Sequence, residues 1–79
     1  MVFAGYQIDI GDNLAIEYDE VLSSGNVSRF FYIGIVKGTY PTVGGGTGMR
    51  LEADTGYIIN LIDIYVTRID NFKDLLIRI

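Results

Sequence analysis

"YIINLIDIYVTRIDNFKDLLIRI", residues 57–79, decides the fold class of this chain. Read with a helical period, its apolar side chains recur three or four residues apart and form a stripe of Ile58, Ile62, Tyr65, Ile69, Phe72, Leu76 and Ile79. The residue types favour strands, because β-branched and aromatic side chains dominate the segment and lose rotamer freedom in a helix. Asp70-Asn71 interrupts the segment like a turn, and "DLLIRI" would follow as a short closing strand. We therefore expect strands here.

The segments upstream are also typical of strands. "YQIDIGDNLAIEYDEV" (residues 6–21) and "MRLEAD" (residues 49–54) alternate apolar and polar side chains with period two. Between them, "VSRFFYIGIVK" (residues 27–37) is rich in aromatic and β-branched residues and predicts a more fully buried strand, with Gly34 at a bulge or a close approach. Glycine, asparagine, aspartate and serine clusters separate the segments as turns.

We predict one all-β domain over residues 1–79, a small antiparallel β-sandwich or barrel of five to seven short strands. The alternative is an α+β fold, in which a C-terminal helix over residues 58–79 packs on an antiparallel sheet.

The composition predicts self-association. A chain of 79 residues has a marginal core, and without cysteine or histidine it has neither disulfides nor the commonest zinc ligands to support it. Hydrophobic residues make up 49% of the chain and charged residues only 20%, so apolar surface is expected to face another chain.

The charge pattern argues against nucleic acids as partners. The net charge is −4, and the six basic residues are scattered singly, whereas phosphate binding needs clustered Lys and Arg. The N-terminal residues lack the basic start of a signal peptide, and no run reaches the ~20 apolar residues of a membrane span. We expect a soluble protein with no membrane partner.

The glycine run in "YPTVGGGTGMR" (residues 40–50) fails two tests for phosphate binding. A P-loop needs lysine after its last glycine, and Met49 stands there. A dinucleotide fingerprint needs glycine where Met49 and Leu51 stand. The run is therefore predicted to be a flexible connector between strands, or at most the lip of a weak ligand site formed by Gly44, Gly45, Gly46 and Gly48.

No residue pattern predicts catalysis. Glu17 and Asp19 share one face of a strand, which is typical of a solvated surface, and no calcium-loop spacing accompanies them. The serines have no histidine to activate them. We assign no catalytic, cofactor-binding or metal-binding residue, and predict that the chain is not an enzyme and has no cofactor.

Residues 49–79 resemble small virion proteins of tailed phages. The shared pattern is a short strand, a turn ending in Gly-Tyr, a long strand ending in "IYVT", a polar turn and a strand of the type L-x-I-x-I. Such segments occur in β-sandwich modules of capsid decoration and fibre proteins, which often form trimers. The resemblance implies a structural role in a virion or the host cytoplasm, with a capsid as the larger partner.

We therefore expect a self-associating structural protein, a homo-oligomer with the trimer favoured, such as a capsid decoration protein. Candidate interface anchors are Phe30, Phe31, Tyr40, Phe72 and Ile79. Two alternatives remain. One is a module that binds a nucleotide or sugar at the glycine loop, and the other is an acidic protein inhibitor of a larger enzyme.

Overall fold

A computed structural model describes residues 1–72, which form seven strands and one short 3-10 helix. In chain order these are β1 (Val2–Phe3), β2 (Tyr6–Gln7), β3 (Asn13–Val21), β4 (Val27–Pro41), β5 (Thr47–Glu52), β6 (Ile58–Ile62), the 3-10 helix η1 (Asp63–Tyr65) and β7 (Val66–Asn71). All neighbouring strands are antiparallel. The predicted all-β class is confirmed.

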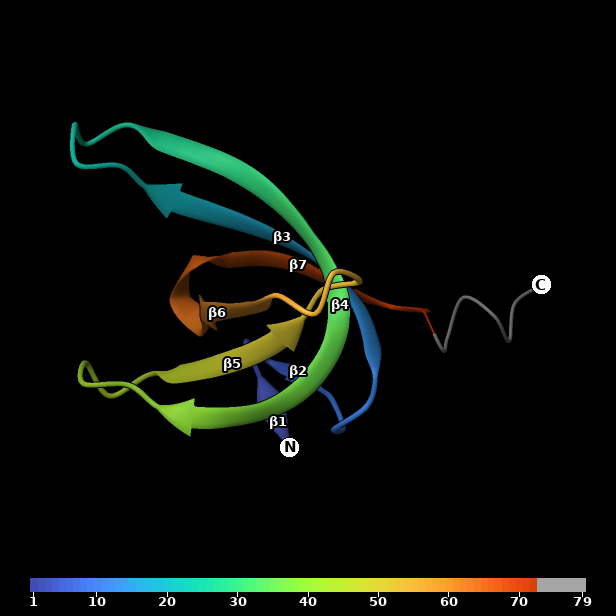
Figure 1. The fold of residues 1–79 in the computed structure, drawn as a ribbon. Coiled ribbons are helices and arrows are strands. Elements are labelled where there is room, and N and C mark those ends of the chain that lie inside the picture. Colours follow the sequence, from blue (N-terminus) through green and yellow to red (C-terminus); the bar gives the residue numbers. More distant parts are fainter. Residues whose placement is uncertain (73–79) are drawn as a thin grey trace.

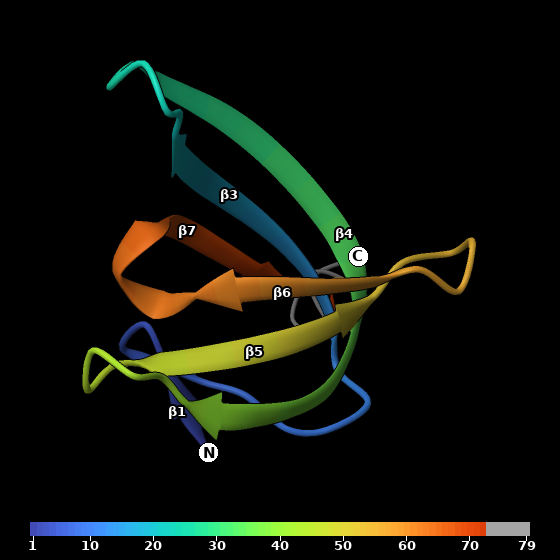
Figure 2. The same ribbon diagram turned by 60° about the vertical axis from the view of Figure 1, so that its left-hand side comes forward.

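Five strands make one sheet, in the order β6-β5-β4-β3-β7, that curls strongly on itself (Figure 1). The central strand β4 belongs to both halves of the curl, since residues 27–35 pair with β3 and residues 35–41 pair with β5. The register of the second ladder shifts between Val36 and Gly38, and such an irregularity bends a strand. The result is an open barrel, seen from a second direction in Figure 2.

The core lies on the concave side of this sheet. Within residues 1–72, ten apolar side chains are buried: Phe3, Ile8, Leu14, Ile16, Tyr18, Val36, Met49, Leu51, Leu61 and Ile69. Those of β3 and β5 follow the period-two alternation that the sequence shows, because successive side chains of a strand point to opposite faces. The alternation of these two strands therefore identifies the inner face of the barrel.

The β1–β2 hairpin adds two of these core side chains, Phe3 and Ile8, from outside the five-stranded sheet. The Ile8 N–H donates to the Met1 carbonyl at 2.9 Å, which holds the hairpin closed. Two further backbone hydrogen bonds join the segment that follows to β4, from Gly11 N–H to the Val36 carbonyl and from Val36 N–H to the Asp12 carbonyl. The N-terminal segment is thus part of the same packed unit as the sheet.

The predicted helix alternative over residues 58–79 is wrong for the residues that the structure describes. Residues 58–71 form β6, η1 and β7, and of the stripe residues up to Phe72 only Ile69 is buried, while Ile58 and Tyr65 are exposed. β-branched residues fit a pleated strand better than a helix, so local preference prevails over the helical spacing. The predicted strand "DLLIRI" and the anchor Ile79 lie outside the described residues.

Gly34 is required by a close approach between strands and not by its backbone angles. A Cβ atom at Gly34 would collide with the carbonyl group of Glu52 on β5 and would come within 3.0 Å of Leu51 Cγ. Gly38, four residues further along the same strand, has open space at the corresponding position. The first glycine therefore allows the packing of β5 on β4, whereas the second does not limit it.

We expect Gly34→Ala to lower the free energy of unfolding by about 1–3 kcal/mol, the usual cost of overpacking. Gly38→Ala is the matched control and should change it by less than about 0.5 kcal/mol. Urea unfolding followed by circular dichroism measures both. Equal losses in the two variants would contradict the close-approach explanation.

Candidate functional site

The outward face of β4 carries a row of exposed apolar side chains, which we call the outer stripe: Phe31, Ile33 and Ile35. Their exposed fractions are 73%, 56% and 41%. The residues between them lie on the covered side of the strand: Tyr32 is half-buried and Gly34 is buried. The expectation of a more fully buried strand over residues 27–37 is therefore wrong, since no second layer of the described chain covers its outer face.

Charged side chains border the outer stripe and are paired with one another. On β3, Glu17 and Asp19 both contact the guanidinium of Arg29, at 3.3 and 2.8 Å. The hydrogen bond from Arg29 lowers the pKa of the Asp19 carboxyl group. On the other side Lys37 pairs with Glu52 at 3.2 Å. The stripe is thus framed by charge pairs of both signs.

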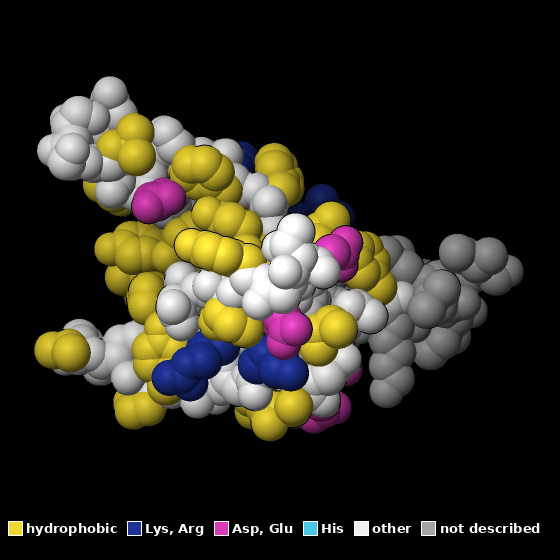
Figure 3. Space-filling model, in the orientation of Figure 1, with side chains coloured by type: hydrophobic (Ala, Val, Ile, Leu, Met, Phe, Trp, Pro, Cys, Tyr) yellow, Lys and Arg dark blue, Asp and Glu magenta, His cyan; other side chains and the backbone are white. Residues whose placement is uncertain are grey.

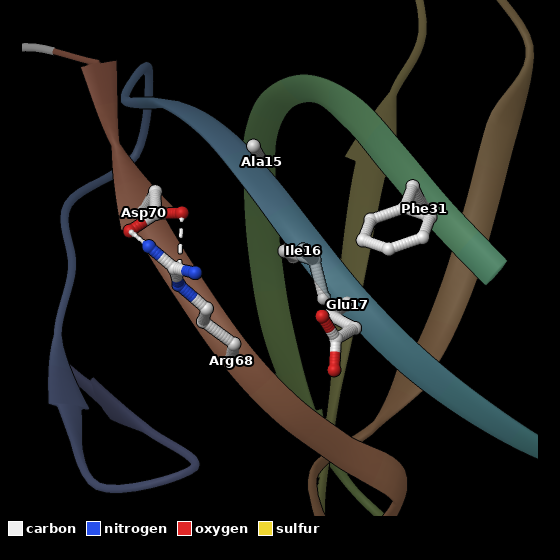
Figure 4. A pocket seen from close by; sticks show the side chains of 6 residues that line it. All are labelled: Ala15, Ile16, Glu17, Phe31, Arg68 and Asp70. Carbon is white, nitrogen blue, oxygen red and sulfur yellow. Dashed lines mark hydrogen bonds and ion pairs between the residues drawn. The ribbon is translucent and has the colours of Figure 1, made fainter. Parts of the chain in front are cut away.

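A shallow hollow of about 70 Å³ lies beside the stripe, where the small side chain of Ala15 leaves space (Figure 4). Figure 4 shows Phe31 on one side of it, from β4, and the Arg68–Asp70 ion pair on the other, from β7. Glu17 of β3 lies between them. This hollow continues the outer face from β4 across β3 to β7.

An aromatic cluster on the concave side fills the space between β6 and β7, the two edge strands of the sheet, which do not pair. The ring of Tyr18 meets those of Tyr32 and Tyr65 edge-on at centroid distances of 6.0 and 5.9 Å, and Phe30 stacks on Tyr32. The Tyr18 hydroxyl accepts a hydrogen bond from the Ile62 N–H at 3.3 Å. Burial raises the pKa of the Tyr18 phenol, an effect that this hydrogen bond opposes.

The glycine loop, residues 42–46, is an ordered turn built around Thr42. The Gly46 N–H donates to Thr42 Oγ1 at 3.0 Å, and the two residues also share the backbone bond from Thr42 N–H to the Gly46 carbonyl. Gly45, with φ at +83°, donates to the Thr42 carbonyl. These hydrogen bonds close the turn. The sequence predicted a flexible connector here and gave no sign of them.

A cavity of about 260 Å³, the glycine-loop cavity, lies beside the contact between this turn and η1. It is lined by Thr42, Gly44, Gly46, Ile62, Asp63, Ile64 and Tyr65. The predicted lip residues Gly44 and Gly46 thus face a real cavity, whereas Gly45 forms the turn. Gly48 lies in β5 beneath the ring of Tyr40, where a Cβ atom would collide with that ring.

The structure separates the predicted interface anchors. Phe31 belongs to the outer stripe, while Phe30 belongs to the aromatic cluster on the other face. Tyr40 covers Gly48 and carries the Arg50 guanidinium on its ring, 4.5 Å from the centroid. Phe72 is half-buried directly after β7. Of the four anchors within residues 1–72, Phe31 and Tyr40 thus point to the outer face of β4, because Tyr40 pairs with Gly48 and its neighbour Thr39 pairs with the buried Met49.

Sequence reasoning missed Ile33, Ile35 and Asp63. Phe31, Ile33 and Ile35 alternate along the strand, but the apolar residues between them gave the sequence no sign of which set is exposed.

Within residues 1–72, no group of three or more acidic residues is placed to hold a metal ion. In the same part of the chain, no helix has the length and apolar character to cross a membrane.

A scan against protein-family models matched none, and comparisons with curated proteins and with solved structures gave no match either.

We expect Tyr18→Phe to lower the free energy of unfolding by about 1–3 kcal/mol, because the Ile62 N–H loses its acceptor. The raised pKa of Tyr18 means that the folded state holds this proton more tightly than the unfolded state. Stability is therefore fully present below the ordinary tyrosine pKa of 10.0 and is lost as the pH rises through the folded value.

Urea unfolding between pH 8 and 11.5 measures both effects, and Tyr18→Phe should make the alkaline loss shallower. Tyr57→Phe is the control, since Tyr57 is 72% exposed. A Tyr18→Phe variant with wild-type stability and an unchanged alkaline slope would contradict this role of the hydroxyl.

Proposed function

We propose that this chain is a self-associating structural protein whose copies dock through the outer stripe. The observation that carries the proposal is the exposure of Phe31, Ile33 and Ile35 in a continuous row on a sheet face. Full burial of a Phe or Ile side chain contributes about 1.5–3 kcal/mol, and monomers rarely leave such residues grouped in water.

The charges beside the stripe favour a second copy of the same chain as the partner. Arg29 is paired with Glu17 and Asp19, and Lys37 is paired with Glu52. An interface over the stripe therefore buries no unpaired charge, which is the arrangement that costs least on association. Interfaces between identical subunits are also the more apolar kind.

We expect the oligomer to be closed, as most homo-oligomers are. Two copies related by a two-fold axis would lay stripe against stripe, as isologous interfaces do. Three copies around a three-fold axis would each contribute the stripe to a shared centre, and this is the trimer expected from the virion resemblance. The mass of the assembly in solution distinguishes the two.

The specific form of the proposal is a virion protein that decorates and stabilises a phage capsid. It is supported by the resemblance of residues 49–79 and by the all-β architecture with an uncovered apolar face. In this role the stripe would bury area between copies while the remaining surface contacts the capsid lattice.

Sedimentation velocity of the full chain should give an oligomer that Phe31→Lys converts to monomer, because the stripe would then bury an ammonium group without a partner. Tyr57→Lys is the matched control: it adds the same charge in place of an aromatic ring that is 72% exposed, against 73% for Phe31. We expect this control to keep the wild-type mass. A wild-type monomer at micromolar concentration would contradict self-association.

Co-sedimentation with phage capsids tests the virion role separately. The wild-type chain should pellet with capsids at a fixed stoichiometry, whereas free oligomer stays in the supernatant. An oligomer that never pellets would exclude decoration and leave self-association standing.

A further inference from the structure

The glycine-loop cavity is lined by a carboxylate with one oxygen that has no hydrogen-bond partner among residues 1–72. Asp63 begins η1 and lines the cavity, and its Oδ1 is shielded from water with no hydrogen-bond donor among residues 1–72. A carboxylate oxygen removed from water without a donor loses free energy, and a cation brought to the group restores part of it. Asp63 therefore gives the wall of this cavity a half-buried negative charge, which favours a cation in the cavity.

The basic side chains of residues 1–72 are occupied elsewhere. Within the described chain, each Lys and Arg residue already has a partner: Arg29 with Glu17 and Asp19, Lys37 with Glu52, Arg68 with Asp70, and Arg50 on the ring of Tyr40. None of these contacts involves Asp63. Within residues 1–72, no Lys or Arg side chain is therefore left to pair with this carboxylate.

Gly46 holds the loop against Asp63. A Cβ atom at Gly46 would lie 2.8 Å from Asp63 Oδ1, so that one of the two would have to move, and 3.2 Å from Thr42 Oγ1, which is a tight contact. The loop backbone therefore covers one side of the carboxylate and leaves the cavity as the approach from the other. The hydrogen bonds of the turn to Thr42 keep this wall in place before any ligand arrives.

The remaining walls suit the rest of a basic side chain. Ile62 and Ile64 supply aliphatic surface for a methylene stem, and Tyr65 supplies an aromatic ring that is 37% exposed. Cations are attracted to aromatic faces, and the weakly hydrated guanidinium of arginine can also lie flat on a ring. The volume of about 260 Å³ is below the range of about 300–1,000 Å³ typical of whole-ligand pockets, so the cavity fits one side chain and not a nucleotide.

We propose that the glycine-loop cavity receives the guanidinium of an arginine side chain presented by a partner protein. The guanidinium lies between the Asp63 carboxylate and the ring of Tyr65, and its methylene stem packs on Ile62 and Ile64. The net charge of −4 favours the approach of such a basic partner at long range. This cavity and the outer stripe share no residue, so the test of arginine binding does not depend on whether the chain self-associates.

The test uses the 15N-labelled full chain and three short peptides, acetyl-Gly-X-Gly-amide with arginine, citrulline or lysine at X. We expect the arginine peptide to give saturable amide shifts at Gly44, Gly46 and Ile64. Citrulline has the same shape without the charge and should bind about tenfold more weakly, the factor of one charge-assisted hydrogen bond. Shifts that are absent, or equal for arginine and citrulline, would overturn the proposal, and equal binding of lysine would overturn the choice of guanidinium.

Two variants locate the site. Asp63→Asn should weaken binding of the arginine peptide about tenfold, while Asp54→Asn, in an exposed turn, should leave it unchanged. Ile64→Lys places a cation beside the cavity at a side chain that is 73% exposed, so it should repel the peptide without unfolding the protein. Tyr57→Lys adds the same charge in the turn at the opposite end of β5 and should not (Figure 2). Unchanged binding in both Asp63→Asn and Ile64→Lys overturns the assignment.

Discussion

The bend of β4 is the constraint on which the rest of the structure depends. One strand of 15 residues pairs with β3 along its first part and with β5 along its second, and only a bent strand can do both. Gly34 permits the close contact with Glu52 at the bend, and the register shift before Gly38 absorbs the change of direction. The curl brings Leu14 of β3 and Leu51 of β5 into one core.

The bend also determines which surfaces remain uncovered. A curled sheet of five strands encloses one small core on its concave side, and the β1–β2 hairpin fills that side with Phe3. The convex side has no second layer within residues 1–72, so the alternate side chains of β4 stay in water. On the concave side β6 and β7 do not pair, and the gap is filled by aromatic rings, of which Tyr65 also lines the glycine-loop cavity. Figure 3 shows hydrophobic side chains gathered on this side of the molecule. The apolar row and the cavity are thus two products of one geometry.

Sequence reasoning reached the fold class because the deciding information was local. The alternation around Leu14 and Leu51 and the β-branched residues of 58–71 depend on near neighbours in the chain. The exposure of Ile33 could not be predicted from the sequence. Tyr32 and Ile33 are both apolar, and only the tertiary structure shows which of them is covered. The proximity of Gly46 to Asp63 is a tertiary contact between two segments separated by two strands, and no residue pattern encodes it. The failure of the glycine run to match phosphate loops was readable, whereas the carboxylate facing it was not.

The position of β7 has a consequence for how the chain acquires its structure. β7 pairs with β3, and Thr67 on β7 donates to Glu17 on β3 across 50 residues of chain. The other ladders of the sheet join strands that follow one another, so they can form in sequence as hairpins. The last ladder must close a loop containing all of them, and such non-local closure slows folding because its entropy is lost before the contacts form. Until β7 arrives, β3 has one unpaired edge and its inner residues, Tyr18 among them, are incompletely covered. The barrel can therefore be complete only after nearly all of the described chain, as far as Asn71, has been synthesised.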